Sequence, residues 1–155
     1  MKILTFMLSI LFTLHLGAKP MKKEIATLAC RIYLSSHYMS LPELKVDVLN
    51  LGTSVVLTLD GHLNALTVGG LESSLDAVLA TDVQRVVLEC SGLSFTSSAG
   101  LRVFLATVKR MKARGGTCAF ASLTPTVHDV FEMAGFLETM EVHTSRESAL
   151  VSENL

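Results

Sequence analysis

The sequence predicts an α/β protein with a mixed, largely parallel β-sheet and helices mainly on one face of that sheet. Two patterns lead to this prediction. After residue 40, short runs of apolar and β-branched residues alternate with longer segments in which apolar residues recur at helical spacing. The first two runs are separated only by a turn signal, which predicts an opening hairpin. The expected order is therefore β-β-α-β-α-β-α-β-α, with right-handed crossovers between the parallel strands.

The composition fits one ordinary domain and excludes several classes of protein. The chain has 155 residues, of which 50% are hydrophobic, and 13 Lys+Arg against 14 Asp+Glu leave a formal net charge of −1. This apolar content excludes a disordered chain, while the balanced charge and 6% aromatic residues argue against nucleic-acid binding. Three widely spaced cysteines without a C-x-x-C pair predict neither a disulfide framework nor a zinc site. The five histidines share no ligand spacing, so we expect no metal and no cofactor.

The N-terminal apolar stretch is expected to lie outside the folded domain. Residues 3–16 are almost entirely apolar and follow a single lysine. This run is shorter than the roughly 20 residues that a transmembrane helix needs. It resembles a secretory signal, although Leu16 stands where a small residue is preferred. Because Met39 is an alternative start, we expect residues 1–38 to be a signal, a tether or a mis-assigned start, and residues 39–155 to form the domain.

The first elements of the domain are an expected hairpin and a helix. Residues 44–48 alternate apolar and charged side chains, the period of a half-buried strand. Residues 50–52 supply a turn, and the β-branched run 55–59 follows as a more buried strand that Asp60-Gly61 is expected to close. Residues 67–80 then change to helical spacing, with an apolar face made of Leu71, Leu75, Val78 and Leu79.

The middle of the chain predicts a buried strand over residues 83–88 and a loop over residues 93–96. A cluster of small residues, Ser97-Ser98-Ala99-Gly100, precedes a strongly amphipathic helix. The expected buried face of this helix consists of Leu101, Phe104, Leu105, Val108 and Met111. Basic residues near its end and the pair Gly115-Gly116 predict where the helix stops.

The last part of the chain predicts two further strand–helix pairs. Residues 117–121 form an expected strand, and Thr124-Pro125 predicts a helix start with Thr at the N-cap and Pro at the first position. Gly135 is expected to end this helix, whose buried face consists of Val127, Val130, Phe131 and Ala134. Residues 139–142 predict a short strand, and residues 145–151 predict a final helix capped by Ser145.

Catalytic motifs are absent from the sequence, whereas one helix start carries two hydroxyl groups. No G-x-S-x-G elbow, Walker loop or G-x-G-x-x-G segment occurs. Cys90 follows a strand, where a free cysteine is usually a small core residue. Ser97 and Ser98 stand at a predicted helix start, where unpaired backbone N–H groups and the helix dipole favour negative charge. A serine there can be the N-cap of the helix, or it can carry a phosphate.

From residue 44 to residue 150 the chain resembles the STAS domain family, especially the bacterial anti-sigma factor antagonists. The segments that carry the resemblance are residues 55–65, 86–102, 115–116 and 130–136. The second of them corresponds to the signature region of the family. The resemblance implies a STAS-like fold and a switch that is not an enzyme. Such a switch binds an anti-sigma factor or serine kinase when unphosphorylated, and releases it once a serine at this helix start is phosphorylated.

The resemblance also implies which residues carry the switch. Matched by position, Ser98 is the expected phosphoacceptor, and Ser97 is the second candidate. The residues expected to contact the partner are Ser97, Ser98, Arg102, His62 and Asn64. The surface around the two serines and Arg102 is expected to form one patch with the loop from His62 to Thr67, because loops at the carboxyl ends of strands converge in such folds. The sequence departs from the common Asp-Ser-Ser/Thr-Gly pattern of antagonists, because Ser97 takes the Asp place and Ala99 the second hydroxyl place.

Two other functions stay open at this point. STAS domains also serve as adaptor subunits of membrane or lipid transport systems without a phosphorylation cycle. A small enzyme could use Cys90 or the Ser97/Ser98 pair as nucleophile, but no base stands at a recognisable spacing, so we expect no enzyme. A cytosolic kinase as partner implies a cytoplasmic domain. Export would follow if the N-terminal run were a cleaved signal, and any membrane contact is expected only through residues 1–20.

Overall fold

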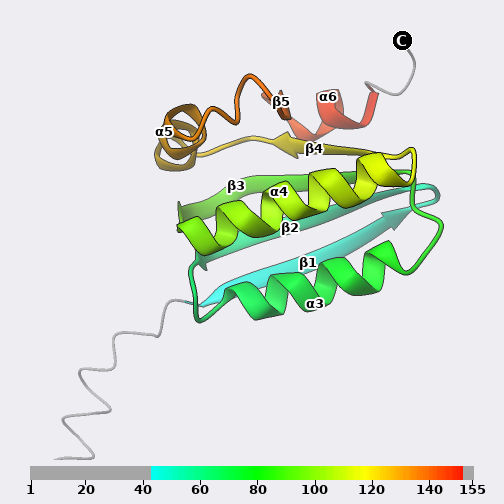
Figure 1. Ribbon diagram of the computed structural model, residues 1–155, viewed down its shortest axis with the longest axis horizontal. Coiled ribbons are helices and arrows are strands. Elements are labelled where there is room, and N and C mark those ends of the chain that lie inside the picture. Colours follow the sequence, from blue (N-terminus) through cyan, green and yellow to red (C-terminus); the bar gives the residue numbers. More distant parts are fainter. Residues whose placement is uncertain (1–42, 152–155) are drawn as a thin grey trace, which may run out of the picture. The chain divides into compact units, whose positions relative to one another are not determined.

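The computed structural model describes residues 43–151, so the predicted domain boundary at residue 39 lies outside the described residues. With the labels of Figure 1, the elements in chain order are β1 (Leu44–Leu51), β2 (Ser54–Leu63), α3 (Val68–Leu79), β3 (Arg85–Thr96), α4 (Ser98–Ala113), β4 (Thr117–Ala121), α5 (Pro125–Met133), β5 (Glu141–His143) and α6 (Arg146–Val151). This order is the predicted one. None of the helices in the described part is long and apolar enough to cross a membrane.

The described strands form one sheet in which spatial order follows chain order, β1-β2-β3-β4-β5. β1 and β2 are antiparallel and form a hairpin in which Leu51 pairs with Ser54. Gly52 lies in the turn with a φ of +76°, a value that glycine adopts at little cost. The pairs β2–β3, β3–β4 and β4–β5 are all parallel. The prediction of a mixed, largely parallel sheet is therefore confirmed.

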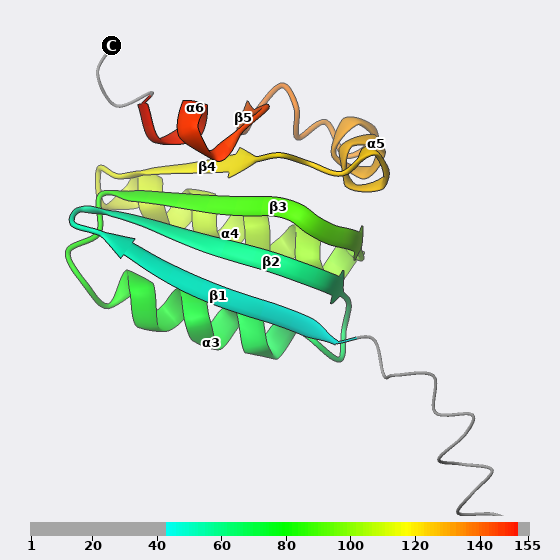
Figure 2. The ribbon, with the colours of Figure 1, turned by 180° about the vertical axis from the view of Figure 1, so that it is seen from behind.

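The helices are distributed unequally over the two faces of the sheet. Figures 1 and 2, which view the sheet from opposite sides, show α3 and α4 along one face. Buried residues of α3, α4 and α5 form a single hydrophobic cluster with one face of the strands, whereas Ala149 of α6 packs on the other face. Aromatic contacts join the core of α4, β4 and α5, with ring centroids 5.2 Å apart for Phe104–Phe120 and 5.1 Å for Phe120–Phe131. Helices mainly on one face were expected, and this is confirmed.

Both central strands are longer than predicted. β2 continues through Gly61 to Leu63, and residues 93–96 belong to β3 rather than to a loop. The pairing of β2 with β3 shifts register before Asp60 and again after Gly61. Gly61 has a φ of +113°, and a Cβ at this position would lie 2.0 Å from the Glu43 carbonyl oxygen. The glycine that suggested the end of a strand therefore marks an irregularity inside it, as glycines in strands often do.

The buried face of α4 is rotated relative to the predicted one. Of the predicted residues, the buried ones are Phe104, Val108 and Met111. Leu101 and Leu105 are only half-buried, while Val103 and Thr107 are buried instead. The reason is that α4 packs against α3 as well as against the sheet. Thr107 is tolerated there because its hydroxyl donates to the Val103 carbonyl at 2.8 Å.

Glycine ends both α4 and α5, as predicted. Gly115 (φ +75°) and Gly135 (φ +69°) adopt the left-handed conformation just beyond the two helices. The N–H of Gly116 donates to the Met111 carbonyl, and the N–H of Phe136 donates to the Phe131 carbonyl, which closes each C-terminus. Ala134 was expected in the buried face of α5. It is exposed, because it is the C-cap residue of this helix.

Candidate functional site

The candidate site lies at one end of the sheet, where β2 and β3 end and where α3 and α4 begin (Figure 1). Parallel strands joined by crossover helices bring these ends together. The N–H of Ser97 donates to the Leu63 carbonyl at 2.9 Å, which ties the start of α4 to the end of β2. His62 is exposed and pairs with Phe95 across the two strands, with ring centroids 6.3 Å apart. The structure thus bonds Ser97 to the residue that follows His62, which puts both predicted residues at the same end of the sheet.

Asn64 organises the loop between β2 and α3. Its side-chain oxygen accepts hydrogen bonds from the N–H groups of Leu66 (2.8 Å) and Thr67 (3.2 Å). The Thr67 hydroxyl in turn donates to the His62 carbonyl at 2.7 Å. This loop holds Leu66 79% exposed at the edge of the site. Thr67 was predicted only as the end of this loop, and its hydrogen bond to the His62 carbonyl adds a positioning role.

The two candidate serines have different surroundings. Ser97 is the N-cap residue of α4, but its side chain makes no capping hydrogen bond. Its hydroxyl oxygen is buried and has no hydrogen-bond partner among the described residues. Ser98 is the first residue of the helix, and it is exposed. The first turn of α4 also contains no acidic residue, so neither a side-chain cap nor a carboxylate compensates its unpaired backbone N–H groups.

Gly100 allows the start of α4 to lie directly against the strands. A Cβ at this position would lie 2.5 Å from the Thr96 hydroxyl oxygen and 2.6 Å from Cδ2 of Leu63. Thr96 is buried, and its hydroxyl, like that of Ser97, has no partner in the described part of the chain. In the sequence, Gly100 is only one of several small residues. Its role depends on contacts with β2, which the local sequence does not reveal.

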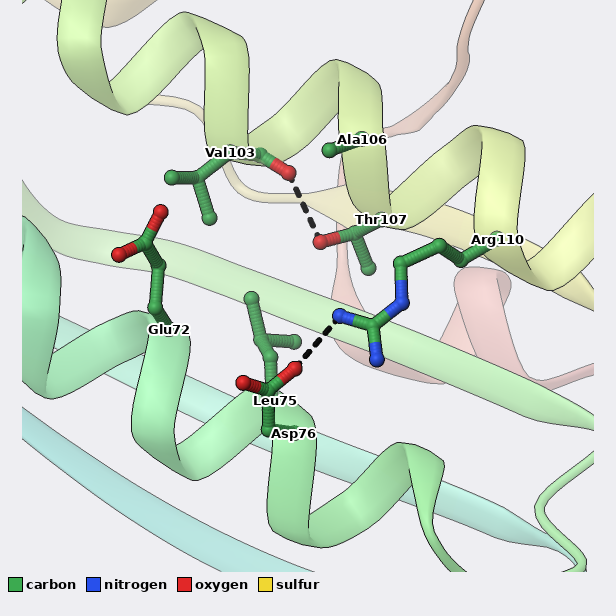
Figure 3. A pocket seen from close by; sticks show the side chains of 7 residues that line it. All are labelled: Glu72, Leu75, Asp76, Val103, Ala106, Thr107 and Arg110. Carbon is green, nitrogen blue, oxygen red and sulfur yellow. Dashed lines mark hydrogen bonds and ion pairs between the residues drawn. The ribbon is translucent and has the colours of Figure 1, made fainter.

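Arg102 lies one turn beyond Ser98 on α4, and its side chain is exposed. Beyond it, α3 and α4 enclose a cleft of about 300 Å³ (Figure 3), whose lining residues are Glu72, Leu75, Asp76, Val103, Ala106, Thr107 and Arg110. An ion pair of 2.6 Å between Arg110 and Asp76 spans this cleft. The lining combines aliphatic side chains with one ion pair and one isolated carboxylate, and offers no paired acid and base for catalysis.

Cys90, which the sequence offered as a nucleophile, and its neighbour Glu89 are both buried. Cys90 is fully buried, and burial raises the pKa of its thiol far above the usual range, so the reactive thiolate is not formed at neutral pH. Glu89 is also buried, and its carboxylate accepts hydrogen bonds from the Ser91 N–H (3.2 Å) and the Ser122 hydroxyl (3.3 Å). These contacts hold the buried carboxylate in place between a backbone N–H and a hydroxyl group.

Comparison with known proteins assigns the chain to a family. The STAS domain model matches residues 45–149, and the chain belongs to this family. Over 95 residues it is 38% identical to BtrV of Bordetella bronchiseptica, a candidate anti-sigma factor antagonist, and the match covers 61% of this chain and 82% of BtrV. The family resemblance of the sequence is thereby confirmed.

Solved structures share the fold at lower identity. SpoIIAA, an anti-sigma factor antagonist and Bacillus cell fate determinant, matches in its unphosphorylated form with a TM-score of 0.62 and 22% identity, covering 72% of this chain and 98% of SpoIIAA. Its phosphorylated form matches with a TM-score of 0.58 and 20% identity, covering 71% and 100%. A sulfate transporter family protein from Wolinella succinogenes matches with a TM-score of 0.55 and 13% identity, covering 67% and 87%. The fold therefore occurs in both functional classes and does not distinguish them.

Proposed function

We propose that this chain is an anti-sigma factor antagonist that acts as a phosphorylation-controlled partner switch. In its unphosphorylated form it binds an anti-sigma factor that is also a serine kinase, and phosphorylation of Ser98 releases that partner. The observation that carries the proposal is the contrast between the two serines at the start of α4, an exposed Ser98 beside a Ser97 whose hydroxyl is buried. Similarity to BtrV favours this function over that of a transport adaptor.

The chemistry at Ser98 is a phosphoryl transfer that the partner kinase catalyses. The Ser98 hydroxyl oxygen attacks the γ-phosphorus of ATP, the bond to the ADP oxygen breaks, and ADP leaves. The hydroxyl proton goes to a base of the kinase. The product carries about −1.5 to −2 charges, which the N-terminus of a helix accommodates because its dipole is positive there. The domain therefore stays folded, and the phosphate weakens the binding of the partner instead.

The partner is proposed to dock on the exposed surface around Ser98. Leu66 and Phe95 are 79% and 42% exposed, and they provide apolar contact area beside His62. Arg102 provides a positive charge on the same end of the domain. An apolar surface with a cation at its rim suits a protein partner with an acidic group. A phosphate dianion in this surface is strongly hydrated. When the partner binds, the phosphate has to lose this water or is repelled by the acidic group of the partner. Both effects weaken binding, so the partner is released.

The unphosphorylated chain is first used to capture the partner kinase. The chain is then incubated with this kinase and ATP in vitro, and the phosphorylated residue is identified by peptide mass spectrometry. We expect phosphate on Ser98, none in Ser98→Ala, and undiminished incorporation in the matched control Ser97→Ala. Ser98→Asp should weaken partner binding, whereas Ser98→Ala should bind normally. Phosphate found only on Ser97 would contradict the assignment of the acceptor. Phosphate on neither serine would refute the switch and favour the adaptor function.

We also propose that residues 39–155 form the domain and that it works in the cytoplasm, where a kinase has ATP. Mass spectrometry of the intact native protein tests this proposal. A chain that retains its N-terminus, or one that begins near Met39, is expected. A mature N-terminus immediately after Ala18 would mean export and would contradict it.

A further inference from the structure

Arg102 differs from the other arginines of the described chain, because its guanidinium has no hydrogen bond or ion pair with any described residue. Each of the others is engaged: Arg85 with Glu141, Arg110 with Asp76, Arg114 with the Leu79 carbonyl and Arg146 with Glu147. Because Arg102 is exposed and has no partner, its guanidinium is available to bind an anion. The position of Arg102 on α4 indicates where that anion would lie.

Arg102 follows Ser98 by four residues on the same helix, and both residues are exposed. Side chains at this spacing are neighbours on a helix surface, and an anion that precedes a cation by four residues has the favourable orientation. The planar guanidinium can also bind two phosphate oxygens at once. A phosphate on Ser98 therefore lies within reach of Arg102 without any change of the backbone.

We propose that Arg102 binds the phosphate of phosphorylated Ser98. This inference rests on the proposed function and adds a regulatory step to it. In the unphosphorylated chain the guanidinium points to solvent and is available to an acidic group of the partner. Phosphorylation pairs it within the domain and so withdraws a positive charge from the docking surface. The switch then has two parts, an added dianion and a removed cation.

The start of α4 offers the phosphate few competing interactions. The Ser97 side chain caps nothing, and no acidic residue occupies the first turn. The ionisable side chains of the neighbouring elements are Asp60 and His62 on β2, Glu72 and Asp76 on α3, Arg85, Glu89 and Cys90 on β3, and His128, Asp129 and Glu132 on α5. Glu72 lines the cleft between α3 and α4 (Figure 3), and none of the ion pairs among the described residues involves Glu72 or Arg102. A phosphate on Ser98 brings a larger charge than a carboxylate, and its position four residues before Arg102 on α4 is fixed.

The test uses the full chain with phosphoserine encoded genetically at position 98, so that no kinase is needed. The second pKa of the phosphate is measured by ³¹P NMR titration in the parent, in Arg102→Gln and in the matched control Arg110→Gln. An ion pair favours the dianion, so the parent should have a second pKa about 0.2–0.4 units below that of Arg102→Gln. Arg110→Gln removes the same charge two turns further along α4 and should leave the value within about 0.1 unit of the parent.

A second measurement follows the guanidinium directly. The Arg102 Nε–H resonance should shift and exchange more slowly with water once phosphate is present, and circular dichroism should show that all variants are folded. Equal phosphate pKa values in the two variants, or an Arg102 resonance that does not respond to the phosphate, would overturn the inference. A kinase that never modifies Ser98 would refute the proposed function instead, and the encoded phosphoserine would still report on Arg102.

Discussion

The last carbonyl groups of helix α4 accept hydrogen bonds, whereas the N–H groups of its first three residues have no partner among the described residues. At its C-terminus the N–H groups of Gly115 and Gly116 bond to the Lys112 and Met111 carbonyls. Arg114 next to them donates to the Leu79 and Thr81 carbonyls at the end of α3. At the N-terminus, the side chain of the N-cap residue makes no capping bond and the first turn has no carboxylate. The same helix therefore has a closed end, the C-terminus with its bonded carbonyl groups, and an open end, the N-terminus without a side-chain cap.

In the proposed switch, this contrast lets one helix stay in place while its exposed first residue is modified. The buried side chains in its middle and the bonds at its C-terminus hold α4 against the sheet and α3. Ser98 in the first turn is exposed, so a modification of its side chain changes the surface without disturbing the buried contacts of the helix. A phosphate at this end supplies the negative charge and the hydrogen-bond acceptors that the helix start lacks.

The largest effect should come from the middle of the helix. Phe104 is fully buried between Phe120 and Phe131, so Phe104→Ala leaves a cavity in the aromatic core. We expect a loss of about 3–5 kcal/mol in the free energy of unfolding, measured by urea denaturation. A loss below about 1 kcal/mol would be typical of a surface residue and would contradict the packing of α4 described above.

The two ends of α4 can be compared directly through one arginine at each. Arg114→Ala removes hydrogen bonds from a charged donor to the Leu79 and Thr81 carbonyls, and should cost about 1–2 kcal/mol. Arg102→Ala removes no bond to a described residue, and should change the stability by less than about 0.5 kcal/mol. Chemical denaturation of both variants is the measurement. Equal losses would show that the two ends do not differ as proposed.

A smaller effect should come from the backbone at the closed end. Gly115 has a φ of +75°, so Gly115→Ala should destabilise the domain by about 1 kcal/mol through strain. Gly69→Ala is the matched control, because Gly69 lies in the first turn of α3 with open space around its Cβ position. That substitution should stabilise the domain by about 0.5 kcal/mol. Melting temperatures that shift in the same direction for both variants would contradict the left-handed closure of α4.

The smallest effect should come from the open end. Replacing an N-cap serine by alanine usually costs about 1 kcal/mol, but the Ser97 hydroxyl makes no bond, so Ser97→Ala should cost less than about 0.5 kcal/mol. Ser97→Asp introduces the carboxylate that antagonists commonly carry here, and should stabilise the domain by about 0.5 kcal/mol. If Ser97→Ala destabilises the domain by a full kcal/mol, Ser97 is an ordinary cap and this end of α4 is not open.

The order of the elements could be predicted because each helix or strand has its own spacing of apolar residues and is followed by residues that end it. The apolar face of α3, the strand 117–121 and the glycines after α4 and α5 are all local features. The lengths of β2 and β3 could not be predicted, because Gly61 and Gly92 look like turn residues in sequence. Only the pairing of the two strands, with Asp60 opposite Gly92, shows that the glycines lie inside them.

The candidate site was predictable in its location but not in its detail. A helix start with two serines after a strand is visible in the sequence, and the carboxyl ends of parallel strands meet. The burial of the Ser97 hydroxyl and the exposure of Ser98 depend on how closely Gly100 approaches Leu63, which is a contact between distant segments. Asn64 was predicted to contact the partner, and that stays a prediction. The structure adds a second role, because its side chain holds the loop before α3.

The strand order also has a consequence for synthesis on the ribosome. Because each strand pairs with the one made just before it, the growing chain adds strands to an existing edge and never inserts one between two others. Such vectorial assembly leaves few long-lived gaps for mispairing. The residues of the candidate site all come from β2, β3, α3, α4 and the connections between them, so they emerge before β5 and α6. The nascent chain can therefore complete the proposed docking surface before its last two elements are made.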